Sequence, residues 1–205
     1  MIAQPDALAA RLRATHVRAG GTMDMRVTGL QLRQGEMRLH ERRDHPRPER
    51  ALFRDCMSRV ASAVHIVTTD GVAGLGGITA SAVASVSDDP ATMLVCVNKS
   101  SHSAPRFIAN KVFCINTLAA DDQALADCFA GRTGLHLDAR FQPGIWDRLA
   151  SGAPVLGTAI AIFDCRVLDI QDVATHHVMI GEVLAVRLLR EGKCLAYHDR
   201  RYLAV

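Results

Sequence analysis

The sequence predicts a mainly β fold with a few helices, in which antiparallel strands form a barrel. Segments rich in Val, Ile and Thr, bounded by Gly, Asp or Pro, recur from residue 51 onward. Helical stretches between them are too few to act as crossovers in an all-parallel sheet. The joint at residues 190–193 is short enough for an antiparallel hairpin. An antiparallel barrel is therefore the expected architecture.

One domain with an appendage fits the length of 205 residues. The excess of positive charge lies entirely in the first fifty residues, which hold ten arginines, six acidic residues and no lysine. We expect residues 1–50 to be an Arg-rich, poorly ordered extension and residues 51–205 to be the folded domain. An electrostatic docking segment for an acidic partner or for nucleic acid is the alternative role for the extension.

The first half of the domain is expected to alternate strands with short helices. Apolar residues at helical spacing between Leu52 and Val60 predict a helix. The elements expected after it are a strand over residues 63–69, a glycine-rich strand up to Ser81, a loop up to Pro90, a strand over 92–98, a short helix from His102 and a strand over 112–118.

The second half is expected to return to long strands. Residues 121–130 form an amphipathic pattern with Asp121 near the helix cap, and residues 132–146 are irregular. Three long strands are expected after that, over residues 159–170, 178–189 and 194–203.

Composition excludes several classes of protein. The longest apolar stretch, residues 153–163, is too short to span a membrane, and no secretory signal is visible. The six cysteines form no CxxC pair and predict buried free thiols. The near-neutral domain lacks interleaved basic and aromatic residues. We therefore expect a cytoplasmic protein with no membrane or nucleic-acid partner.

Residues 76–90 place small and hydroxyl-bearing side chains on a strand that opens into a loop. Backbone groups beside so little side-chain bulk are accessible to a flat polar heterocycle, and the hydroxyls of Ser85 and Ser87 could reach its polar tail. An ordinary Ala/Ser-rich turn would give the same pattern.

A second candidate segment follows the strand over residues 92–98. Lys99, Ser100 and Ser101 precede an expected helix, whose first N–H groups are unpaired. This arrangement predicts a phosphate site. Helix capping by Ser101 or Ser103 is the alternative explanation.

A third candidate is the pair His176 and His177 at the start of a strand. Adjacent side chains on a strand point to opposite faces, so the two rings cannot easily share one metal ion. The chain also lacks HExxH and Walker motifs and a complete GxGxxG fingerprint. We therefore expect no metal site and no dinucleotide fold of the Rossmann type.

Taken together and in this order, these segments resemble the flavin reductase-like family, the reductase components of two-component flavin-dependent monooxygenases. The resemblance runs from about Leu52 to Tyr202, and its most specific part is Gly-Ile-Thr-Ala-Ser-Ala-Val-Ala-Ser-Val-Ser at residues 77–87. Residues 180–183, Ile-Gly-Glu-Val, match a further family segment. The pyrimidine-degradation reductases and the 4-hydroxyphenylacetate monooxygenase reductases look most similar.

The resemblance implies a homodimeric split β-barrel of Greek-key type, with the flavin bound near the subunit interface. His176 matches the histidine that contacts nicotinamide, although Ala174 and Thr175 replace the commoner Gly-Asp before it. The residues that match flavin-binding positions are Thr79, Ala80, Ser81, Ser85, Val86, Ser87, Asn98, Lys99, Ser100, Ser101, His102, Arg200 and Tyr202.

The implied activity is that of an NAD(P)H:flavin oxidoreductase. It would reduce FMN or FAD by hydride transfer from NADH or NADPH and supply the reduced flavin, by diffusion, to a partner monooxygenase. The chemistry then belongs to the flavin, which accounts for the absence of a catalytic triad. A flavin-binding protein without reductase activity is the alternative, which the altered residues before His176 keep open.

Overall fold

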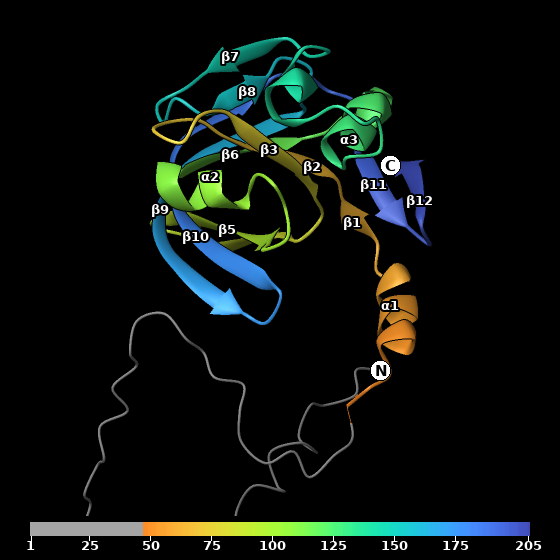
Figure 1. Cartoon of the computed structure of the whole chain (residues 1–205). Helices are drawn as coiled ribbons and strands as arrows, with labels where there is room; N and C mark the ends of the chain where they lie inside the picture. The colour runs from red at the N-terminus through yellow and green to blue at the C-terminus, as the bar shows by residue number, and fades with distance from the viewer. Residues whose placement is uncertain (1–46) are drawn as a thin grey trace, which may run out of the picture. The chain divides into compact units, whose positions relative to one another are not determined.

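The computed structural model describes residues 47–205, which form three α-helices and twelve strands in three antiparallel sheets (Figure 1). The expected order or disorder of residues 1–46 lies outside the described part of the chain. The elements are α1 Arg50–Ser58, β1 Ser62–Ala63, β2 His65–Thr69, β3 Gly76–Ala80, β4 Val83–Asp88, β5 Ala91–Asn98, α2 Ala104–Asn110, β6 Val112–Thr117, η2 Ala120–Asp122, α3 Gln123–Phe129, η3 Leu137–Phe141, β7 Trp146–Arg148, β8 Pro154–Leu156, β9 Ala161–Val173, β10 His176–Leu188, β11 Leu195–His198 and β12 Arg201–Ala204.

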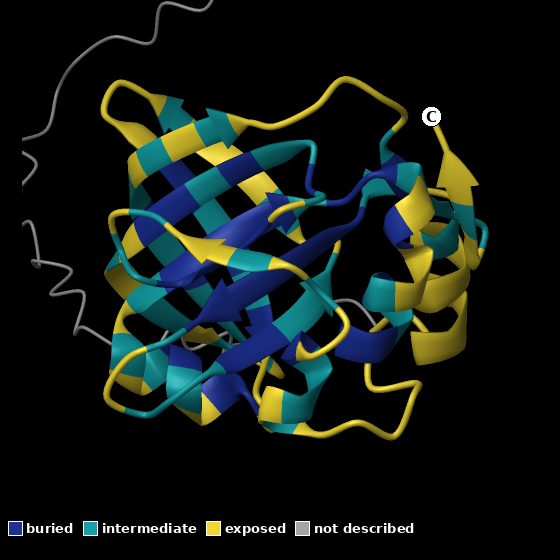
Figure 2. Ribbon diagram, turned by 90° about the horizontal axis from the view of Figure 1, so that it is seen from above, coloured by how far each residue is buried: buried dark blue, intermediate teal, exposed yellow. Residues whose placement is uncertain are grey.

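The main sheet has seven strands in the order β3-β2-β6-β9-β10-β5-β4. Strands β2 and β6 of this sheet are buried on both faces, because successive side chains alternate between two separate cores: Ile66 packs in one and Val67 in the other. Figure 2 shows the buried residues gathered in these strands. All-round burial explains why β2 and β6 contain so many β-branched and apolar residues.

Each core is covered by elements that the main sheet does not contain. One core includes Phe129 of α3 and Leu156 of β8, while the other includes Phe107 of α2. Two glycines are required by this packing. A Cβ at Gly77 would lie 2.5 Å from the Phe129 ring, and a Cβ at Gly181 would lie 2.5 Å from the Phe113 ring.

The expected loop before Pro90 is wrong, since residues Val83–Asp88 form strand β4. β4 is an edge strand that pairs only with β5, with Val83 opposite Val95. Because its side chains are mostly exposed, an Ala/Ser-rich sequence suffices there, and composition alone suggested a turn.

The expected third long strand is also wrong, because residues 194–203 form two strands, β11 and β12. The chain reverses at Asp199 and Arg200, whose φ angles are 49° and 60°. Nor is the joint at residues 190–193 a hairpin. β10 pairs with β9 and β5, whereas β11 pairs with β1 and β12, so the joint passes from one sheet to another.

The antiparallel, mainly β prediction is confirmed, but a closed barrel is not observed. Strands β3 and β4 are the two edges of the main sheet, and within residues 47–205 no hydrogen-bonded strand pair joins them. The two glycines of β3 and the polar side chains of β4 suit open edges.

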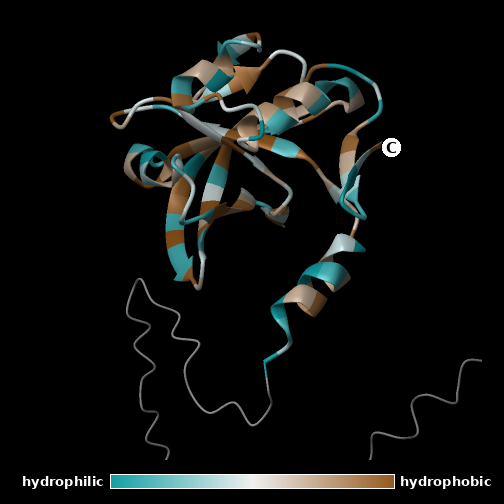
Figure 3. Cartoon of the chain, turned by 45° about the vertical axis from the view of Figure 1, so that its right-hand side comes forward, coloured by the Kyte–Doolittle hydropathy of each residue, from teal (hydrophilic) through white to brown (hydrophobic). Residues whose placement is uncertain are grey.

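The predicted first helix forms as α1, but its apolar side chains are not buried. Leu52 and Phe53 are each 58% exposed, and Figure 3 shows hydrophobic and hydrophilic residues alternating around the helix. α1 contacts the β11–β12 turn, where the N–H of Asp199 donates to the carbonyl of Ser58 at 2.7 Å.

The six cysteines carry free thiols, as expected, and three of them, Cys114, Cys128 and Cys165, are buried. Cys56 on α1 is exposed, contrary to expectation. None of the helices in the described part of the chain is long and apolar enough to cross a membrane.

Candidate functional site

A cavity of about 550 Å³ lies where the ends of several elements meet, a size suited to a small-molecule ligand. It is bounded by β3, β5, β10, the turn before α2, the end of α3 and η3. The lining residues are Ile78, Thr79, Ala80, Ser81, Ala82, Cys96, Asn98, Ser100, Ser101, His102, Phe129, Ala130, Gly131, His136, Arg140 and His176.

The β3 wall presents backbone groups beside small side chains. Within residues 47–205, β3 pairs with β2 alone. On its other side the N–H and C=O of Gly77 are bonded to the Ser103 hydroxyl, whereas the backbone groups beyond Gly77 are available to a ligand. The hydroxyl of Thr79 donates to the carbonyl of Ala126 at 2.6 Å, which ties this wall to α3. The predicted residues Thr79, Ala80 and Ser81 therefore line the cavity, and the hydrogen bond to α3 holds this part of the wall in place.

Strand register brings the second and third predicted segments together. His176 at the start of β10 lies directly opposite Asn98 at the end of β5, and the N–H of Lys99 donates to the carbonyl of Thr175 at 3.0 Å. Asn98 Oδ1 accepts from both the N–H and the hydroxyl of Ser100, each at 2.9 Å. These bonds hold the turn that carries Ser100, Ser101 and His102 against the cavity.

The two histidines point to opposite faces, as predicted. His176 lines the cavity, and its Nδ1 lies 2.9 Å from the Thr175 hydroxyl, which leaves Nε2 available to a ligand. His177 instead contacts Asp172, with 2.5 Å between Nδ1 and the carboxylate. This hydrogen bond lowers the pKa of Asp172.

Several predicted residues lie outside the cavity. Lys99 is held by Asp172, 3.5 Å from its Nζ. Arg200 forms an ion pair with Asp55 of α1. Three more, Ser85, Val86 and Ser87, lie on the edge strand β4.

Tyr202 lines a smaller neighbouring pocket of about 220 Å³, which shares Thr79, Ala80 and Ser81 with the cavity. Burial raises the pKa of the Tyr202 hydroxyl. The Arg132 guanidinium lies 5.7 Å from the centre of its ring. The two pockets are therefore adjacent, and Ala130 after α3 also borders both of them.

Sequence reasoning missed the wall formed by Phe129, Gly131, His136 and Arg140. Aromatic packing places it: the Phe129 and Phe141 rings meet edge to face at 4.9 Å, and Trp146 Nε1 donates to the carbonyl of Phe141 at 2.8 Å. The basic residues of this irregular segment were the only signal for it in the sequence.

The cavity lining contains one arginine and three histidines but no aspartate or glutamate. Burial raises the pKa of the Cys96 thiol, so this thiol stays protonated and is a poor nucleophile. Hydroxyl, amide and backbone donors without a nucleophile or a carboxylate pair suit binding of an anionic, flat, polar molecule rather than hydrolysis.

Comparison with known proteins agrees with this chemistry. The family model described as a flavin reductase like domain matches residues 57–205. An NADH-dependent FMN reductase, RutF, of Variovorax paradoxus (strain S110) is 48% identical over 153 residues, 75% of this chain and 84% of that protein.

Two solved structures are also similar. BorF, the flavin reductase component of a bacterial two-component tryptophan halogenase, has a TM-score of 0.71 at 30% identity, over 77% of this chain and 98% of that one. The flavin reductase PheA2 has a TM-score of 0.69 at 27% identity, with the same coverage of both chains.

Proposed function

The chain belongs to the flavin reductase-like family, and from this premise we propose that it transfers hydride from NADH to FMN. The single observation that carries the proposal is the cavity itself, in which His176 lies opposite Asn98 and faces no acidic lining residue. The protein is an oxidoreductase, similar over three quarters of its length to an NADH-dependent FMN reductase.

The residues of the cavity fit a flavin. The open edge of β3 offers backbone donors and acceptors beside Thr79, Ala80 and Ser81, which suits the polar edge of an isoalloxazine ring. Asn98, Ser100, Ser101 and His102 supply polar groups for a ribityl phosphate tail. Flavin, when bound, supplies the redox chemistry by accepting hydride from the nicotinamide.

His176 is proposed to position the nicotinamide. Its ring is held by Thr175 through Nδ1, while strand pairing fixes its backbone between Asn98 and Val173. A histidine whose backbone is fixed on both sides and whose ring is held at Nδ1 lowers the entropic cost of aligning two reactants, which is the main contribution that a protein makes to hydride transfer.

Exposed apolar side chains on β10 support a proposal about how the chain assembles. Leu184, Val186 and Leu188 on β10 are exposed, with Leu188 at 85%. We propose that the chain forms a homodimeric split β-barrel in which a second copy covers such apolar area. In that assembly Ser85, Val86 and Ser87 of β4, together with Lys99, Arg200 and Tyr202, complete the flavin site.

The reduced flavin is proposed to serve a partner monooxygenase, as a reductase component such as BorF serves its halogenase. We further propose a cytoplasmic location, since free thiols persist in a reducing compartment. The proposed domain is residues 51–205, preceded by the Arg-rich extension.

Flavin-dependent oxidation of NADH by the purified protein tests the function. Absorbance of NADH is followed in air with FMN, with FAD and without flavin, and the series is repeated with NADPH. We expect oxidation only when flavin is present, fastest with FMN and NADH. Flavin binding without oxidation would instead support a flavin-binding protein that lacks reductase activity.

A further inference from the structure

Arg140, the arginine that lines the cavity, differs from the other arginines between residues 106 and 201. Each of the other arginines from Arg106 to Arg201 forms an ion pair with a carboxylate. Arg140 has no such partner among residues 47–205. A guanidinium beside a cavity without a counter-charge is a ready site for an anion.

The Arg140 side chain is nevertheless held in place. Its Nε donates to the carbonyl of Leu135 at 2.9 Å, and its Nη1 reaches the carbonyl of Phe129 at 3.4 Å. Its Nη2 lies near Gly131, 3.3 Å from the point where a Cβ on that glycine would stand. Two backbone contacts orient the guanidinium and leave further N–H donors for a ligand.

The segment that carries Arg140 is itself fixed. Phe141 is buried in the aromatic cluster with Phe129 and Trp146, and Asp138 forms an ion pair with Arg106 of α2 at 3.0 Å. Such an arrangement loses little conformational entropy when an anion binds.

The other cation expected near the cavity has a different partner. The Lys99 ammonium, predicted as a phosphate ligand, faces Asp172 at 3.5 Å, whereas no carboxylate lines the cavity beside Arg140 and His136. The guanidinium can form two parallel hydrogen bonds to a phosphate, which an ammonium cannot.

We propose that Arg140, with His136 beside it, binds a phosphate group of a nucleotide held in the cavity. This inference rests on the proposed function, whose two reactants both carry phosphate: the monophosphate of FMN and the diphosphate of NADH. Arg140 would then strengthen the binding of FMN or of NADH without taking part in hydride transfer.

The test compares Arg140→Gln and Arg140→Lys with the wild-type protein. Dissociation constants for FMN and for riboflavin, which lacks the phosphate, are measured by quenching of flavin fluorescence. The KM for NADH is measured with riboflavin as acceptor. Arg187→Gln is the matched control, because Arg187 forms an ion pair with Asp147 at 3.0 Å and does not line the cavity.

Loss of a charge-assisted hydrogen bond should weaken the affected ligand about tenfold to a hundredfold in Arg140→Gln, with partial recovery in Arg140→Lys. An effect on FMN but not on riboflavin assigns the flavin phosphate, and an effect on the KM for NADH alone assigns the diphosphate. Unchanged constants, or equal weakening of FMN and riboflavin, would overturn the proposal. A wild-type protein that binds flavin but oxidises no NADH would refute the function, while the flavin arm would still test Arg140.

Discussion

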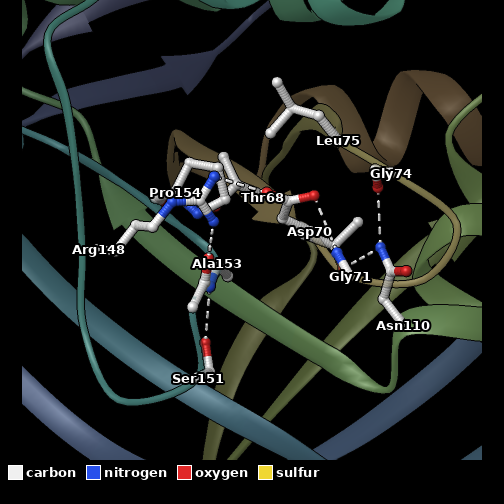
Figure 4. A network of polar contacts seen from close by, with 12 residues as sticks. Thr68, Asp70, Gly71, Gly74, Leu75, Asn110, Arg148, Ser151, Ala153 and Pro154 are labelled. Atoms are coloured by element: carbon white, nitrogen blue, oxygen red, sulfur yellow. Dashed lines mark hydrogen bonds and ion pairs between the residues drawn. The ribbon is translucent and has the colours of Figure 1, made fainter.

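The polar groups beneath the β7–β8 hairpin are hydrogen-bonded to one another, whereas some polar groups of the cavity have no protein partner in the described part of the chain. Beneath the hairpin, the Thr68 hydroxyl donates to the carbonyl of Pro154 at 2.6 Å, and Asn116 Oδ1 accepts from the N–H of Leu156 at 2.7 Å. Figure 4 shows this side of the molecule, with Arg148 bonded to Asp70 and the N–H of Ala153 bonded to the Ser151 hydroxyl. In the cavity, Arg140 and His176 each keep a donor or acceptor that no other group in residues 47–205 uses.

This difference separates structural from functional polar residues. No buried side-chain nitrogen or oxygen in residues 47–205 lacks a hydrogen-bond partner. Groups left unsatisfied therefore occur only where solvent or a ligand can reach them, as at the cavity wall. Substitutions beneath the hairpin should cost stability, whereas substitutions in the cavity should cost binding or rate.

Asn116→Ala should have the largest effect. The substitution leaves the carbonyl of Ile66 and the N–H of Leu156 without their side-chain partner in a fully buried place. We expect the free energy of unfolding to fall by about 2–4 kcal/mol, measured by urea denaturation. A loss below about 0.5 kcal/mol would show that the network is not structural.

Acid should destabilise the protein through His65, which is buried and 3.2 Å from the Thr117 hydroxyl. Burial lowers the pKa of His65 from 6.5 to about 4. Between these values the unfolded chain binds a proton that the folded chain excludes, so stability is complete above pH 6.5 and falls as the pH drops toward 4.

The loss attributable to His65 is about 3 kcal/mol at most. Unfolding by urea across this pH range should show it, and His65→Asn should flatten the dependence. A His65 ring that titrates in the folded protein near its ordinary pKa, followed by NMR, would contradict the assignment.

His176→Ala should act on rate and leave stability nearly unchanged. We expect flavin reduction to slow about tenfold to a hundredfold, because a positioning group is lost, with little change in the dissociation constant for FMN. Lys99→Ala combined with Ser101→Ala should do the reverse and mainly weaken FMN binding. Rapid mixing of NADH with the flavin-loaded protein, beside fluorescence titration, separates the two effects; an inverted pattern would disprove both roles.

Ala174→Gly should have the smallest effect, and it should be favourable. Ala174 adopts a φ of 47° in the two-residue turn between β9 and β10, a conformation that glycine accepts without strain. We expect a gain of about 1 kcal/mol in the free energy of unfolding, with an unchanged rate. A slower rate in this variant would mean that Ala174 also sets the position of His176.

The parts of the site that depend on strands could be predicted from the sequence. Thr79, Ala80 and Ser81 meet Asn98 and His176 because each sits at the end of a strand, and period-2 patterns identify strands locally. The opposite orientation of His176 and His177 followed from the same period. The family resemblance correctly indicated a flavin reductase-like protein.

The parts that depend on non-local packing could not be predicted. Arg140 and His136 reach the cavity because Phe141 packs on Phe129 and Trp146, a contact that no local pattern encodes. The prediction of a hairpin at residues 190–193 was wrong for the same reason. A short joint between two strands does not reveal that the strands belong to different sheets. β4 was missed because edge strands need few apolar residues.

Filling the cavity tests the central claim most directly. Ala82 lines the cavity and not the smaller pocket, so Ala82→Trp should block it, while Val72→Trp at a 93% exposed loop position is the control. FMN binding is measured by fluorescence titration, and folding by thermal unfolding. We predict that Ala82→Trp stays folded but loses FMN binding and that Val72→Trp keeps both; wild-type affinity for FMN in folded Ala82→Trp would show that the flavin binds elsewhere.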